Sequence, residues 1–336
     1  KGKYPKKFEE KYKELQPEKY KDTIEHVIQK GNTPAGMHIS IMVKEIIDFL
    51  NIQPGEIGFD ATLGYGGHTK AMLKCLNGKG HIYATDVDPE ESDKTKKRLA
   101  DQGFGEDLLT VKLQNFCTID EIAKEVGGFD FILADLGVSS MQIDNPKRGF
   151  SFKVDGPLDL RLNQDAGISA AERLDTITRD ELAGMLYENS DEPYCEELAK
   201  AITDEIRKGN RIDTTTKLRQ VIEKTLDFLP EKEKKDTIKK TCQRTFQALR
   251  IDVNREFEVL YEFMEKLPDA LRPGGRVAIL TFHSGEDKLV KKALKEGYKA
   301  GIYSDYAKDV IRPSAQECAQ NGRARSTKMR WAVKNK

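Results

Sequence analysis

The sequence has few of the features that place a chain in a membrane or outside the cell. No apolar run approaches the roughly 18 residues of a membrane helix, so we expect no membrane partner. The Lys-rich start is followed by no apolar segment, so we expect no signal peptide. The five cysteines are scattered, with no C-x-x-C pair, which indicates reduced thiols in a cytoplasmic protein. The five histidines show no metal-ligand spacing, and no metal site is expected.

A net charge is also lacking, because 56 Lys and Arg are balanced by 56 Asp and Glu. This balance argues against a protein that coats nucleic acid with its whole surface. The distribution is uneven, however: residues 288–336 hold 13 Lys and Arg against 4 Asp and Glu. Contact with a phosphate backbone requires a local basic patch of this kind, and a merely solvated surface is the alternative.

One stretch organises the rest of the chain. An apolar run ends at Asp60, residues 64–67 contain three glycines, and His68 then enters a helical pattern. A strand, a tight turn and a helix start are typical of the unit that holds nucleotide-like cofactors in doubly wound α/β sheets. A second strand ends at Asp86, where an acid can accept hydrogen bonds from the ribose hydroxyls of a cofactor.

The glycine turn differs from the dinucleotide fingerprint, in which G-x-G-x-x-G follows the strand directly. Here Asp60 closes the strand four residues before Gly64, in a D-x-x-x-G-x-G arrangement. This arrangement resembles motif I of class I methyltransferases, which bind S-adenosylmethionine. Thr62 stands where that motif usually has a glycine. The turn therefore favours adenosylmethionine over a nicotinamide cofactor.

Alternating strand and helix patterns predict an α/β fold, a class I (Rossmann-like) methyltransferase fold with a doubly wound, mostly parallel sheet. Strands are expected at 56–60, 81–86, 108–113, 129–135 and 276–282, and a last antiparallel edge strand at 328–333. We also expect one helix over 246–267 and a turn over 272–275. Because ligands bind beyond the carboxyl ends of parallel strands, Asp60, Asp86 and Asp135 should converge on one crevice.

The alternation stops in the middle of the chain, where only amphipathic helical stretches occur. Residues 178–181 have capping-box spacing. We expect residues 165–243 to form an inserted all-helical substrate-recognition subdomain. Residues 37–164 and 244–336 would then form the cofactor-binding methyltransferase domain, and residues 1–36 an N-terminal extension.

A long irregular segment follows the fourth strand, and such segments inside compact domains are usually functional. It contains Asp135-Leu136-Gly137-Val138-Ser139-Ser140, Arg148-Gly149-Phe150-Ser151-Phe152 and Asp155-Gly156-Pro157-Leu158-Asp159, followed by Arg161. These motifs resemble the central signature of the bacterial MraW/RsmH family, whose members methylate N4 of a cytidine in the decoding region of small-subunit ribosomal RNA. Further matching motifs, from His38 to Ser326, extend the resemblance over most of residues 38–333.

The resemblance implies S-adenosylmethionine as the methyl donor. Carried over by position, its contacts fall on Gly66, Gly67, His68, Asp86, Phe116, Asp135 and Gln142. The glycines would bring N–H groups close to the methionine part, and Asp86 would accept from the ribose. Phe116 would lie against the adenine, although the pattern alone favours a core position. Asp135 would position the amino end or the reacting centre.

The implied reaction needs a hydrogen-bond acceptor near a cytosine amine and an orienting surface, but no covalent nucleophile. The candidates are Asp135 and Asp159 as acceptors, Arg161 and His283 for substrate orientation, and Phe150 or Phe152 for stacking on an unpaired or flipped base. Two structural alternatives stay open. Asp159 and Arg161 could form an ion pair that holds their loop, and His283 could be a strand-end histidine with structural contacts only.

Three positions depart from the family pattern. Residues 189–192 read Asn-Ser-Asp-Glu instead of Tyr-Gly-Glu-Glu, Gly285 replaces a leucine, and the segment before Thr245 lacks the usual Pro-Ala-Thr. All three lie outside the cofactor turn and are expected on the substrate side, so they bear on the identity of the substrate.

The expected function is therefore methylation of the N4 amine of a cytidine in small-subunit (16S) ribosomal RNA, with that RNA or the small ribosomal subunit as partner. The alternatives are a paralogous methyltransferase with another RNA or a DNA target, and a non-catalytic ribosome-assembly binder. The chain lacks the D/N-P-P-Y/F motif of amino-methylating DNA enzymes after the fourth strand. It also lacks a G-x-S-x-G elbow, which argues against a hydrolase built on His283 and Ser284. A homodimer stays open.

Overall fold

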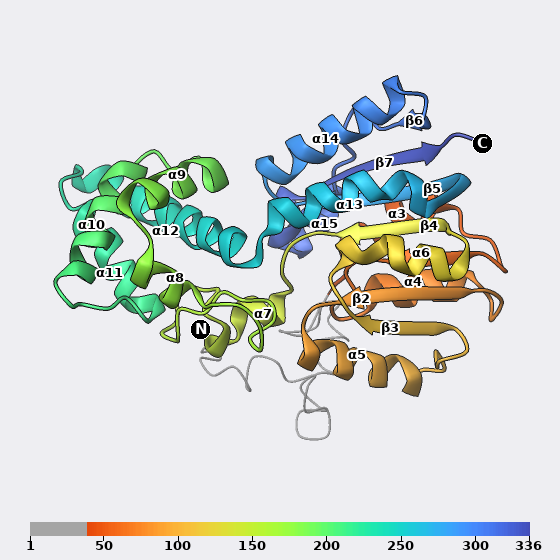
Figure 1. Cartoon of the computed structure of the whole chain (residues 1–336), viewed down its shortest axis with the longest axis horizontal. Coiled ribbons are helices and arrows are strands. Elements are labelled where there is room, and N and C mark those ends of the chain that lie inside the picture. Colours follow the sequence, from red (N-terminus) through yellow and green to blue (C-terminus); the bar gives the residue numbers. More distant parts are fainter. Residues whose placement is uncertain (1–38) are drawn as a thin grey trace. The chain divides into compact units, whose positions relative to one another are not determined.

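A computed structural model describes residues 39–336, which divide into two compact units (Figure 1). The α/β unit consists of residues 39–139 and 257–336, and the helical unit of residues 140–256. The expected N-terminal extension and His38 lie outside the described residues.

The division falls at residues 140 and 256 rather than at the expected 165 and 243. The irregular segment belongs with the helices because Leu158 N donates to Asp213 O at 2.9 Å and Gly156 N to Thr215 Oγ1 at 3.1 Å. At the other end, helix α12 (Glu231–Asn254) runs unbroken across the expected boundary.

The α/β unit is built on a seven-stranded sheet in the order β3-β2-β1-β4-β5-β7-β6. The strands are β1 (Ile57–Asp60), β2 (His81–Asp86), β3 (Leu109–Leu113), β4 (Phe129–Asp135), β5 (Leu271–Thr281), β6 (Tyr303–Tyr306) and β7 (Lys328–Lys334). β1 to β5 pair in parallel, and β7 is antiparallel to both β5 and β6. The doubly wound, mostly parallel sheet of a class I methyltransferase fold is thus confirmed.

Two predictions about the end of this sheet were wrong. β7 is antiparallel as predicted, but it is not an edge strand, because β6 pairs with its other side. The short β6, Tyr-Ser-Asp-Tyr, has no apolar run that would reveal it. The predicted turn at 272–275 lies inside β5 as a register shift opposite β4, where Gly274 has φ +77°.

Helices cover both faces of the sheet because successive strand residues point to opposite sides. The helices of this unit are α3 (Val43–Leu50), α4 (Gly67–Cys75), α5 (Pro89–Asp101), α6 (Ile119–Val126), α13 (Glu256–Ala270), α14 (Ser284–Lys299) and α15 (Ala315–Gln320), with the short turns η2 (Phe116–Thr118) and η4 (Gly322–Ser326). Ile132 and Ile279 pack in one buried cluster with residues of α6, α13 and α14. Phe131 and Leu280 pack in a second cluster with residues of α3, α4 and α5.

The helical unit contains α7 (Ser140–Asp144), η3 (Pro146–Arg148), α8 (Ala170–Thr176), α9 (Arg179–Ser190), α10 (Cys195–Arg207), α11 (Thr215–Thr225) and α12. Thr178 caps α9 by accepting from Glu181 N at 3.2 Å, which confirms the predicted start of that helix. The single helix predicted over 246–267 was wrong, because Arg255 has φ +51° and separates α12 from α13.

Within residues 39–336, none of the helices combines the length and apolar character needed to cross a bilayer. The same part of the chain contains no group of three or more His, Cys, Asp or Glu side chains that could hold a metal ion.

Candidate active site

The loop between β1 and α4 depends on its glycines. Gly66 is the N-cap of α4 with φ +88°, a conformation that L side chains rarely adopt. At Gly67 a Cβ atom would overlap Ser40 Oγ. No side chain caps α4, so the N–H groups of its first turn are available to an acceptor from outside, and an anion is favoured there.

Asp60 closes β1 and lies fully buried beneath this turn. Its Oδ2 accepts from Thr69 Oγ1 at 2.6 Å and its Oδ1 from Thr62 N at 3.0 Å. Burial raises the pKa of Asp60 above its usual value. These contacts give Asp60 a bracing role in the turn, since neither oxygen faces outward.

Asp86 ends β2 on the other side of the turn. Its Oδ2 accepts from Gly64 N and its Oδ1 from Asp88 N, both at 3.0 Å. Burial raises the pKa of Asp86 to about 6, against the effect of these two bonds. Each carboxylate oxygen has a further lone pair, so Asp86 can still accept from a hydroxyl of a ligand.

Asp135 ends β4 and is tied to the same turn, because its backbone N–H donates to Thr62 Oγ1 at 2.7 Å. Thr62, which replaces a glycine of motif I, thus joins two strand ends. The three acids end neighbouring strands at one edge of the sheet, but Asp60 is fully buried, so the expectation that all three face one crevice fails for Asp60. The Asp135 side chain is 22% exposed, and its Oδ1 makes no hydrogen bond to any residue that the structure describes.

The buried imidazole of His68 pairs with Asp135, and its Nδ1 lies 3.3 Å from Asp135 Oδ2. Its Nε2 lies 2.7 Å from the carbonyl oxygen of Ile41. Burial opposes the charged ring, but the contacts with Asp135 and Ile41 outweigh it and raise the pKa of His68. Since both ring nitrogens face acceptors, His68 fits its site as an imidazolium. The sequence contained no signal for Ile41 as a partner.

Phe116 and His283, the other predicted residues of this unit, lie against aromatic neighbours. The Phe116 ring packs edge-on against Phe263 at 5.2 Å, while Phe116 remains only partly buried. His283 caps α14: Nδ1 accepts from Glu286 N at 3.4 Å, and Nε2 lies 3.1 Å from Glu286 Oε1. These contacts favour the structural alternative for His283, and its role toward a substrate stays a prediction.

Gly285, which replaces a leucine of the family pattern, lies against a ring of its own α/β unit. A Cβ atom on Gly285 would lie 2.7 Å from Cζ of Phe257. The Phe257 ring, which also contacts His283 with ring centroids 5.8 Å apart, therefore fills the space that a leucine side chain would enter.

The segment 189–192 also has contacts within its own unit, the helical one: Asn189 departs from the family pattern, and Glu192 matches it. Glu192 is fully buried and accepts from Thr241 Oγ1 at 2.8 Å, and Asn189 Nδ2 donates to Ala248 O at 3.0 Å. These contacts tie the end of α9 to α12. Asn189 and Gly285, two of the departing residues, thus contact the protein itself, and the expectation that the departures lie on the substrate side stays a prediction.

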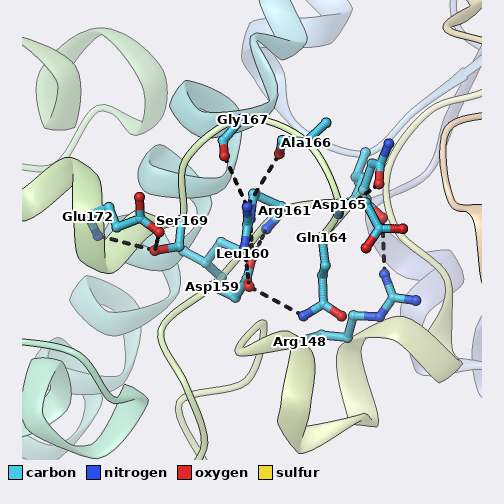
Figure 2. A network of polar contacts seen from close by, with 12 residues as sticks. Arg148, Asp159, Leu160, Arg161, Gln164, Asp165, Ala166, Gly167, Ser169 and Glu172 are labelled. Atoms are coloured by element: carbon cyan, nitrogen blue, oxygen red, sulfur yellow. Dashed lines mark hydrogen bonds and ion pairs between the residues drawn. The ribbon is translucent and has the colours of Figure 1, made fainter.

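Asp159 and Arg161 form a bidentate ion pair in the helical unit (Figure 2). Arg161 Nε and Nη2 donate to Asp159 Oδ1 and Oδ2 at 2.8 and 2.9 Å, and the carboxylate raises the pKa of Arg161. Arg161 Nη1 also donates to Gly167 O at 3.1 Å. Leu160, between the pair, has φ +65°, so the loop holds a strained conformation. This geometry favours the structural alternative, in which Asp159 and Arg161 form an ion pair that holds their loop.

The remaining predicted residues also lie in the helical unit. Phe150 is 9% exposed, and Phe152 packs against Phe246 of α12 with ring centroids 5.7 Å apart. Gln142 is a buried residue of α7. The predicted site residues thus divide between the units: Gly66, Gly67, His68, Asp86, Phe116, Asp135 and His283 in the α/β unit, and Gln142, Phe150, Phe152, Asp159 and Arg161 in the helical unit.

The sequence is similar to known proteins over almost its whole length. The profile of the MraW methylase family matches residues 35–335. A protein of Agathobacter rectalis named ribosomal RNA small subunit methyltransferase H 1 is 88% identical over 333 residues, which cover 99% of this chain and 95% of that protein. A protein of Alkaliphilus metalliredigens named ribosomal RNA small subunit methyltransferase H 2 is 62% identical over 333 residues, which cover 99% of this chain and 95% of that protein. One of Acidobacterium capsulatum, named ribosomal RNA small subunit methyltransferase H, is 36% identical over 301 residues, 88% of this chain and 98% of that protein.

Proposed function

The chain belongs to the MraW methylase family, and we propose that it transfers the methyl group of S-adenosylmethionine to the N4 amine of a cytidine in small-subunit ribosomal RNA. The names of its relatives support the RNA class, because all three are named ribosomal RNA small subunit methyltransferases. The observation that carries the chemistry is the Asp135 carboxylate, which stands at a strand end with Oδ2 on His68 and Oδ1 open.

The residues around the glycine turn fit adenosylmethionine. The uncapped N-terminus of α4 suits the carboxylate of its methionine part, and Asp86 is placed to accept from ribose hydroxyls. We propose that His68 takes part through its backbone, since both nitrogens of its ring are engaged within the protein. Phe116 is proposed to contact the adenine, and Gln142 stays a proposed cofactor residue on the strength of the family motif.

Bound adenosylmethionine supplies a methyl group on a sulfonium centre, which is electrophilic. The cytosine amine is a weak nucleophile because its lone pair is delocalised into the ring. Asp135 Oδ1 can accept an N–H of that amine, which orients the amine and increases its electron density. His68 holds Oδ2, so the carboxylate keeps one orientation. After transfer, Oδ1 can take up the proton that the amine loses.

The helical unit is proposed to recognise the RNA. The Asp159–Arg161 pair would hold the loop that follows Phe150 and Phe152, rather than contact the amine, because the Asp159 oxygens are already bonded to Arg161. Phe152 is proposed as the stacking partner of the flipped base. Ribosomal RNA as substrate implies a cytoplasmic site of action. A homodimer stays a prediction that the molar mass in solution would test.

The proposal is tested by offering labelled adenosylmethionine to small subunits, large subunits and free RNA from a strain that lacks the gene. Nucleoside mass spectrometry should find N4-methylcytidine in the small subunit alone with the natural chain, and at least about 100-fold slower formation with Asp135→Asn. Product in the large subunit or another RNA would point to a paralogue. Adenosylmethionine binding without any transfer to RNA would contradict the proposal.

A further inference from the structure

The exposed face of α14 carries a line of lysines. This lysine stripe consists of Lys288, Lys291, Lys292, Lys295 and Lys299, all exposed. Their spacing of three and four residues places them on one side of the helix, about one turn of 5.4 Å apart. The other side is fixed to the sheet: Val290 and Leu294 are fully buried, and a Cβ on Gly297 would overlap the Tyr303 ring of β6.

Almost nothing in the described part of the chain neutralises this stripe. Lys292 Nζ lies 4.0 Å from Glu296 Oε1, and the other four lysines have no ion pair with a residue that the structure describes. The lysines of α5 differ, since Lys94, Lys96 and Lys97 each pair with a carboxylate at 2.7, 3.6 and 2.9 Å. Like charges three or four residues apart destabilise a helix, so the stripe is unfavourable by itself.

The helix dipole accounts for part of the stripe only. Lysines near the C-terminus of a helix are stabilised by the dipole, which suits Lys295 and Lys299. Lys288 and Lys291 lie outside the last turn of α14, so the dipole does not stabilise their charges. A local arrangement that disfavours the fold without a compensating contact is expected at a surface that binds something.

An aromatic pair with one exposed ring, that of Tyr298, lies at the C-terminal end of the stripe. Tyr298 is 40% exposed, and its ring centroid is 5.0 Å from that of Tyr306. Lys308 Nζ is 6.0 Å from the Tyr298 centroid. Aromatic rings beside lysines are the combination with which proteins bind single-stranded nucleic acid, since a base stacks on the ring while the lysines follow the phosphates.

We propose that the lysine stripe and Tyr298 form a docking surface for single-stranded RNA, outside the site of methyl transfer. This inference rests on the proposed function, which supplies the RNA. The placement favours it, because only two residues separate the end of β5 from the start of α14, and Leu280 of β5 pairs with Asp135. A single-stranded RNA bound along the stripe would therefore extend toward the edge of the sheet that carries Asp135.

The test uses the full chain and a fluorescently labelled single-stranded RNA of mixed sequence, with affinity measured by anisotropy over a range of salt concentrations. The stripe variant is Lys291→Gln, Lys295→Gln and Lys299→Gln together. The matched control, Lys94→Gln, Lys96→Gln and Lys97→Gln, removes the same charge from α5. Adenosylmethionine binding by calorimetry checks that each variant is folded.

The stripe variant should bind the RNA at least about ten-fold more weakly at low salt. The slope of log affinity against log salt concentration should be smaller by about 2 in magnitude, and the control should match the natural chain in both respects. Tyr298→Leu should weaken binding about ten-fold and leave the slope unchanged. An unchanged slope in the stripe variant, or an equal loss in the control, would overturn the surface. The natural chain could also fail to make N4-methylcytidine while the stripe variant shows the smaller salt slope. That result would support the docking surface and contradict the proposed function.

Discussion

His68 holds Asp135 from a buried position, with its Nδ1 3.3 Å from Asp135 Oδ2. The other ring nitrogen is bonded to Ile41 O, so this histidine connects the segment before α3 to the end of β4. The family motif Gly-Gly-His thus combines two functions. Its glycines shape the turn and its backbone can face the cofactor, while the imidazole of His68 positions a carboxylate.

Replacement of His68 should therefore affect the methyl-transfer step more than cofactor binding. We expect His68→Gln to lower kcat by about 100-fold, because the Asp135 carboxylate loses its fixed orientation. The dissociation constant for adenosylmethionine, measured by calorimetry, should change by much less. In an Asp135→Asn background the same replacement should have little further effect on kcat. Equal, independent losses in both backgrounds would show that His68 acts in another way.

Cofactor binding should depend on pH through Asp86. Burial raises the pKa of Asp86 to about 6, so the carboxylate is protonated as the pH falls below that value. If the ribose hydroxyls bind the ionised form, affinity for adenosylmethionine should fall by up to about ten-fold per pH unit below pH 6. Calorimetry between pH 5 and 8 would measure this. Asp86→Asn should bind weakly without that dependence, and a natural chain with flat affinity would contradict the assignment.

The same group should affect stability with the opposite sign. Because the folded pKa of Asp86 lies above the unfolded value of about 3.9, protonation favours the folded state. Its contribution to the free energy of unfolding is fully present below about pH 4 and is lost as the pH rises through 6. Urea unfolding of the cofactor-free chain, compared with Asp86→Asn over this range, would show the difference.

Loss of the Asp159–Arg161 pair should impair the reaction with RNA and leave the binding of adenosylmethionine unchanged. Arg161→Lys keeps the charge but cannot form the bidentate contact, so the strained loop around Leu160 should loosen. We expect about ten-fold lower kcat/KM for RNA and an unchanged dissociation constant for adenosylmethionine. Steady-state kinetics with each substrate varied in turn would test this. A change confined to the cofactor would contradict a loop-holding role.

Gly285 should tolerate leucine only if its neighbour shrinks. Gly285→Leu forces the new side chain into the Phe257 ring, which is 2.7 Å from the position of its Cβ. We expect a loss of about 2 kcal/mol in the free energy of unfolding, as for other overpacked sites. Adding Phe257→Ala should recover part of it. If Gly285→Leu alone is neutral in stability but changes the methylated RNA, the position faces the substrate after all.

Asp287 and Arg330 join α14 to β7. Arg330 Nε and Nη2 donate to Asp287 Oδ1 and Oδ2 at 2.7 and 3.0 Å, and both residues are buried. Asp287→Asn should destabilise the chain by about 3 kcal/mol, because it leaves a buried guanidinium without a counter-charge. Arg330→Leu in the same chain should restore part of the loss, as measured by urea unfolding.

The amino-acid sequence by itself determined the first four strands to within a residue and the glycine turn after β1. The patterns that encode them, a buried run, a strand-end acid and closely spaced glycines, involve residues near one another in the chain, so local chemistry is sufficient. The family motifs likewise carried the methyl donor and the class of reaction.

Tertiary structure alone decided which acids brace and which can face a substrate. Asp60 and Asp135 look alike in the sequence, yet Asp60 is bonded on both oxygens by Thr62 and Thr69, while Asp135 keeps Oδ1 open. One partner of His68 is Ile41, 27 residues away, and the buried partner of Asp287 is Arg330, 43 residues away. Such pairs form only when the sheet and its helices assemble, because a hydrogen bond depends on the distance between atoms in the folded chain and not on their separation in sequence.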